Sequence, residues 1–97
     1  MKSKELSKIF KALSNPYRLE LFLSILKDEQ ASVEKEGCFL GELISHFKIG
    51  APTISHHLKE LVNANLVKTE KEGKFVICKV NHDQLKQIGQ LLSFRKS

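Results

Sequence analysis

Residues 40–61 read LGELISHFKIGAPTISHHLKEL, and this stretch decides the fold. The first part predicts a helix from about Leu40 to Phe47, because its apolar residues recur at helical spacing. Lys48-Ile49-Gly50 then predicts a tight turn, and Pro52 suits the first turn of another helix. Two short helices joined by a turn that contains glycine form the helix-turn-helix pattern, in which the second helix contacts DNA.

The second helix of this pair, about residues 52–64, has two distinct sides. Ile54, Leu58 and Leu61 share one side, so we expect them in the core and expect His56 to point away from it. The outer side and its margins carry short donors, acceptors and a cation, which suit base edges and phosphates. The candidate DNA contacts on this helix are Pro52, Thr53, Ser55, His56, His57 and Lys59.

The two adjacent histidines have other interpretations. His57 lies on a flank of the helix, where packing or a hydrogen bond at a helix junction competes with phosphate contact. His56 is either a DNA contact or a solvated side chain. His56 and Glu60 have the i, i+4 spacing of metal ligands, but no Cys or Asp accompanies them. We therefore predict no metal site and no cofactor.

The flanking sequence completes a mainly helical fold of about five helices with a β-hairpin of two strands. Helices are expected at about Ser3–Leu13, from Pro16 with Asn15 as its N-cap, and from about His82. The second of these is expected to be mostly buried, with Leu19, Phe22, Leu23 and Leu26 on one side and Leu21 and Ile25 beside them. A long polar connection, residues 27–37, follows it.

Residues 66–80 predict the hairpin, with strands at Leu66–Glu70 and Lys74–Val80 and a bridge at 71–73. Lys68, Lys71 and Lys74 are expected to cluster at its tip, where a basic wing contacts the phosphate backbone. The alternative is that these lysines are only solvated and prevent the exposed edge of the hairpin from pairing with another chain. Cys78 is expected to face the core, since it alternates with Val76 and Val80.

Bulk composition fits one domain spanning residues 1–97 and a polyanionic partner. The chain has 97 residues and a formal charge of +5, from 16 Lys and Arg against 11 Asp and Glu. The N-terminal residues lack the apolar core of a signal peptide, so we expect a cytoplasmic protein that contacts no membrane. No nucleophile with its orienting partners and no glycine-rich phosphate loop is present in the sequence, so we predict no enzyme.

The sequence resembles the ArsR/SmtB family of winged helix-turn-helix repressors over roughly residues 5–92. The stretches that carry the resemblance are Phe10–Leu21, Leu40–Leu43, Pro52–Leu61 followed by Asn65–Val67, and Glu72–Val76. It implies a sequence-specific repressor, homodimeric through its first and last helices, with two recognition helices in successive major grooves of a palindromic operator. By position it implies that Thr53, Ser55, His56 and Lys59 face DNA and that Lys71 and Lys74 lie on the wing.

The sequence departs from this family in the residues that sense metal. Cys38 lies one residue before the family's cysteine box and has no second cysteine nearby, and the last helix offers only His82 and Asp83 near its start. A thiol-responsive repressor that senses through Cys38, with or without Cys78, is one alternative, since a cysteine near a helix N-terminus has a lowered pKa. A basic winged-helix module that binds an acidic protein is another.

Overall fold

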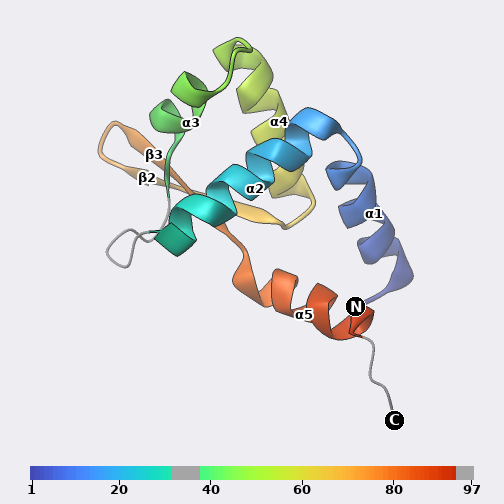
Figure 1. Cartoon of the computed structure of the whole chain (residues 1–97). Helices are drawn as coiled ribbons and strands as arrows, with labels where there is room; N and C mark the ends of the chain where they lie inside the picture. Colours follow the sequence, from blue (N-terminus) through green and yellow to red (C-terminus); the bar gives the residue numbers. More distant parts are fainter. Residues whose placement is uncertain (32–37, 94–97) are drawn as a thin grey trace.

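The computed structural model describes residues 1–31 and 38–93, without the side chains of residues 29–31 and 38. Figure 1 shows a helical body from which a β-hairpin projects, so the predicted mainly helical winged fold is confirmed. Its elements are α1 (Ser3–Leu13), α2 (Pro16–Ala31), β1 (Cys38–Phe39), α3 (Leu40–His46), α4 (Ala51–Asn63), β2 (Val67–Glu72), β3 (Phe75–Val80) and α5 (His82–Leu92).

Helix α2 begins where the sequence predicts, at Pro16. The Asn15 side-chain oxygen accepts hydrogen bonds from the backbone N–H groups of Tyr17 and Arg18, at 3.0 and 3.1 Å. These are two of the amide groups that the first turn of a helix leaves without partners. The cap therefore fixes the end of α2 that crosses α4.

The predicted buried side of α2 is partly wrong. The core takes Leu21, Phe22 and Ile25, whereas Leu23 is 50% exposed and Leu19 also faces solvent. The first half of α2 carries apolar residues on most of its circumference, so periodicity does not determine its orientation; packing against α4 and β3 does. The helix also continues to Ala31, beyond the predicted start of the polar connection, and residues 32–37 lie outside the described residues.

Helices α3 and α4 form the predicted pair. Leu43 is buried in α3, and Ile54, Leu58 and Leu61 are buried in α4. Asn65, two residues after the end of α4, has φ 59°, the left-handed conformation that Asn tolerates well after a helix. The N–H groups of Asn65 and Leu66 donate to the carbonyls of Val62 and Leu61, both at 3.0 Å. This Schellman pattern turns the chain from α4 directly into the hairpin.

The sheet has three antiparallel strands in the order β1-β3-β2. Strand β1 was not predicted, because two residues are too few to show a period. The hairpin loop is also shorter than predicted: Lys71 and Glu72 pair with β3, which leaves Gly73 and Lys74 as the turn. Gly73 has φ 62°, a value that favours glycine at the first position of a two-residue turn.

Helix α5 starts at His82, as predicted, and leaves the sheet through Asn81. The Asn81 side chain accepts a hydrogen bond from the Gln84 N–H at 3.3 Å and donates one to the Asn65 carbonyl at 3.0 Å. Figure 1 shows that α1 and α5 lie on the side of the molecule away from the hairpin tip. No helix within residues 1–31 or 38–93 combines the length and the apolar character needed to cross a membrane.

Replacing Asn15 by Ala should lower the free energy of unfolding by about 1 kcal/mol, because two amides of α2 lose their acceptor. Asn15→Asp should retain most of the stability, since its carboxylate accepts the same hydrogen bonds. Urea unfolding followed by circular dichroism, at one fixed protein concentration, measures both variants. Equal stability of the Ala variant and the parent would show that the cap contributes nothing.

Candidate nucleic-acid interface

Helix α4 presents a polar face to solvent directly opposite its buried side. Pro52, Thr53, Ser55, His56 and Lys59 are all exposed, as the spacing of the apolar residues predicts. The amides of Thr53 and Ile54 donate to the Gly50 carbonyl at 3.0 and 3.1 Å, so the helix starts at the turn predicted from Lys48-Ile49-Gly50. The exposed side chains are of the types that contact base edges and phosphates in recognition helices.

His57 is the exception among the predicted DNA contacts on α4. Its side chain is 8% exposed, and its ring lies nearly parallel to that of Tyr17, with centroids 6.4 Å apart and an interplanar angle of 16°. This is the packing role that its flank position predicted, at the junction of α2 and α4. The geometry therefore favours packing over phosphate contact for His57.

Burial lowers the pKa of His57, and the positive charges of Arg18 and then His56 lower it further. Arg18 is held by a hydrogen bond from its guanidinium to the Ala12 carbonyl at 3.3 Å. The His57 Nδ1 atom is buried and has no hydrogen-bond partner among the described residues. The folded protein consequently favours the neutral form of this imidazole.

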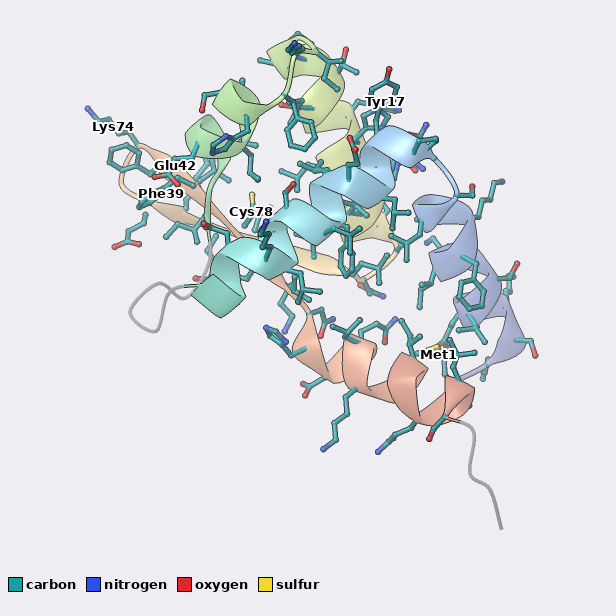
Figure 2. All side chains as sticks on the ribbon, in the orientation of Figure 1. Met1, Tyr17, Phe39, Glu42, Lys74 and Cys78 are labelled. Carbon is teal, nitrogen blue, oxygen red and sulfur yellow. The ribbon has the colours of Figure 1, made fainter. Side chains whose placement is uncertain are left out.

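The hairpin forms an exposed basic wing beyond the first residue of β2. Val67 is buried and the other five residues of β2 are exposed. Lys71 and the turn residue Lys74 lie near the tip, and Figure 2 shows Lys74 at the end of the hairpin. Lys68 does not join them, because it pairs with Lys79 nearer the base of the hairpin. The predicted cluster of three lysines is therefore reduced to two.

The remaining charges of the wing are arranged by the strand register. Lys79 forms an ion pair with Glu70 at 3.0 Å. Glu70, Glu72 and Lys68 alternate with Thr69 and Lys71, so Lys71 projects from the opposite face of β2 to the two glutamates. Within β2, Lys71 is the cation on one face, and the other face carries both carboxylates together with Lys68.

The two cysteines differ, and the prediction that Cys78 faces the core is confirmed. Cys78 is fully buried, and this burial raises the pKa of its thiol to about 11. Such a thiol is unreactive at neutral pH. Cys38 is opposite Cys78 in the backbone register of β1 and β3, but its side chain lies outside the described residues. Thiol sensing through Cys38 stays a prediction.

Two groups of residues that support this surface were not predicted from the sequence. Tyr17 and Arg18 approach His57 from α2, and no local pattern indicates that the start of α2 crosses α4. Asn81 was also missed, although an Asn immediately before a predicted helix is a capping signal. Within the described residues, no three His, Cys, Asp or Glu side chains gather as metal ligands would.

The chain is similar in sequence to known regulatory proteins. Residues 15–69 match the model of the family described as "Bacterial regulatory protein, arsR family". The chain is 41% identical over 92 residues to the arsenical resistance operon repressor of Staphylococcus xylosus, covering 95% of this chain and 81% of that protein. It is 31% identical over 90 residues to the transcriptional repressor SdpR of Bacillus subtilis, covering 92% and 91%.

Among solved structures, the homodimeric winged helix-turn-helix DNA-binding domain Mb0332 of Mycobacterium bovis superimposes with a TM-score of 0.71. The match covers 92% of this chain and 75% of that one at 18% identity. At this identity the likeness shows the fold, and it agrees with the arrangement of α3, α4 and the hairpin described above.

The lowered pKa of His57 predicts a specific pH dependence of stability. The folded protein holds this imidazole neutral. Its contribution to the free energy of unfolding is therefore fully present above the ordinary histidine pKa of about 6.5, and it is lost as pH falls through the lower pKa of the folded protein. Between pH 7.5 and 5.5, the parent should lose more unfolding free energy than His57→Gln. Exposed His46 provides the matched control: His46→Gln should follow the parent. Parallel curves for the parent and His57→Gln would contradict this account.

Proposed function

We propose, on the premise that this chain belongs to the arsR family of bacterial regulatory proteins, that it represses transcription as a dimer bound to a specific duplex. Proteins of this family are transcriptional regulators, not enzymes. Repression is what the named relatives from Staphylococcus xylosus and Bacillus subtilis do. The site of action is the cytoplasm, where an operator is accessible.

One observation carries the proposal: α4 exposes Thr53, Ser55, His56 and Lys59 on the side opposite its buried stripe. A helix that is anchored along one side and polar along the other can enter a major groove while its core packing stays intact. Lys59 and the wing residues Lys71 and Lys74 add positive charge for the phosphates that border that groove.

A homodimer is supported by the apolar surface of the terminal helices. Helix α5 buries Ile88, whereas Leu91 and Leu92 are exposed, Leu92 to 61%. Phe10 of α1 is also exposed, and α1 lies on the same side of the molecule as α5 (Figure 1). The chain is also less compact than a globular domain of the same length, since its radius of gyration is 14.1 Å and that of a compact domain is about 12.5 Å. A second copy that packs on α1 and α5 would cover these side chains.

A two-fold axis through such an interface determines what the dimer binds. Two copies of α4 would enter successive major grooves, with half-sites about 34 Å apart on one side of the duplex. The operator we propose is accordingly a palindrome. Binding by one face of the duplex blocks access to a promoter, which is the mechanism of repression.

Replacing Leu92 by Glu should shift the protein from dimer to monomer, because it places a charge in an apolar interface. Leu23 of α2 is a matched control: it is also half-exposed, but it lies beside the turn between α3 and α4. Leu23→Glu should remain dimeric. Sedimentation equilibrium measures both, and a dimeric Leu92→Glu variant would place the interface elsewhere.

Replacing Thr53 or His56 by Ala should reduce the preference for the operator over scrambled duplex by about 1–3 kcal/mol if the side chain contacts a base edge. Asn63 is exposed at the C-terminal end of the same helix, away from the end that reads bases. Asn63→Ala should keep the parent's preference. Fluorescence anisotropy on an operator selected from random duplexes measures the ratio, and an unchanged ratio for both variants removes α4 from base recognition.

Replacing Lys71 and Lys74 by Gln should weaken binding to operator and scrambled duplex alike. The slope of log K against log salt should become shallower by about 0.9 for each phosphate that the variant no longer neutralises. Lys4 belongs to α1, which lies away from the hairpin tip (Figure 1), so Lys4→Gln should leave the slope unchanged. A slope that does not move in the double variant would show that the wing does not bind phosphate.

A further inference from the structure

A groove opens between the start of α3 and the tip of the hairpin. Its volume is about 400 Å³, and apolar side chains of Phe39, Leu40, Ile44, Phe75 and Val76 line it. A Cβ atom added to Gly41 at the groove wall would meet no atom of the described residues within 4 Å beyond its chain neighbours and the backbone of its own helix. Figure 2 shows Phe39 and Glu42 close to the end of the hairpin that carries Lys74. Pockets of this size hold small organic molecules.

Two phenylalanines form the apolar wall of the groove. The rings of Phe39 and Phe75 lie with centroids 5.4 Å apart and an interplanar angle of 51°. Phe75 is nevertheless 53% exposed, which leaves part of a large apolar ring in water. A flat ring packed against this pair would remove that surface from water in the offset or tilted geometry that aromatic groups prefer.

The charge at the groove selects the class of ligand. The Lys74 ammonium lies 5.7 Å from the centroid of the Phe75 ring, so a molecule packed on that ring would bring a negative group within its reach. Glu42 also lines the groove, and its negative charge would repel a ligand that carried a second carboxylate. We propose that this groove binds an aromatic monocarboxylate, with its ring against Phe39 and Phe75 and its carboxylate on Lys74.

Such a ligand would weaken DNA binding, and this consequence rests on the proposed function. Lys74 is one of the two wing cations proposed to contact phosphate, and a bound carboxylate neutralises it. The groove also joins α3, the first helix of the helix-turn-helix, to the wing, so an occupant contacts both parts of the DNA-binding surface. Because phosphate contacts carry no sequence information, affinity should fall for operator and scrambled duplex alike.

The first arm of the test measures ligand binding without DNA. The probe is 2-naphthoate, whose fluorescence is read directly because the chain contains no tryptophan. We expect saturable binding at one site per chain. Lys74→Gln should weaken it about fivefold, the upper range for a partly exposed charge pair. Lys68→Gln removes the same charge from the same hairpin outside the groove and should bind as the parent does.

Two further reagents test the groove and the charge separately. Gly41→Leu adds a side chain at the groove wall and should abolish naphthoate binding, with the fold verified by circular dichroism. The neutral analogue 2-naphthalenemethanol should bind the parent about as weakly as naphthoate binds Lys74→Gln. The proposal is overturned if the parent does not bind naphthoate at millimolar concentration, if Gly41→Leu binds it normally, or if the alcohol binds equally well.

The second arm adds naphthoate to the protein bound to duplex DNA and follows fluorescence anisotropy. The expected result is a lower affinity for DNA in the parent and no response in Gly41→Leu. If naphthoate binds the free protein but leaves DNA affinity unchanged, the regulatory consequence is wrong. If the protein binds no duplex even without naphthoate, the proposed function fails while the first arm still decides whether the groove binds the carboxylate.

Discussion

The structure depends on the burial of one side of α4. Ile54, Leu58 and Leu61 lie in the core, and each buried side chain of this size contributes roughly 1.5–3 kcal/mol. Together they account for a large part of the about 5–15 kcal/mol by which a domain of this kind is stable. The helix is therefore fixed in rotation, so the side that carries Thr53 and His56 must face solvent.

The wing follows from the way α4 ends. Asn65 adopts the left-handed conformation, and Leu66 then returns to the core, where it is 1% exposed. Asn81 holds the Asn65 carbonyl from the other end of the hairpin, so both strands leave the body at a defined place. Beyond Val67 the strand no longer packs on the core, and Lys71 and Lys74 are carried outward with the hairpin.

Most of this arrangement could be predicted from residues that act locally. The cap at Asn15, the turn glycine at Gly73 and the stripe of α4 each determine their own element by spacing or backbone conformation. Features that require contacts between residues far apart in the sequence could not be predicted in this way. The rotation of α2 depends on what packs against it, the burial of His57 depends on Tyr17 from another helix, and β1 exists only through its pairing with β3.

The central claim is that two copies of α4 read a specific duplex. Selection by the purified chain from a pool of random duplexes tests it most directly, with the stoichiometry of the selected complex measured by sedimentation. We expect enrichment of a palindrome whose half-sites are about one helical turn apart, bound by two chains. A pool that stays random after repeated rounds, while the protein retains only salt-dependent binding to every duplex, would contradict it and would favour a basic surface for an acidic protein partner.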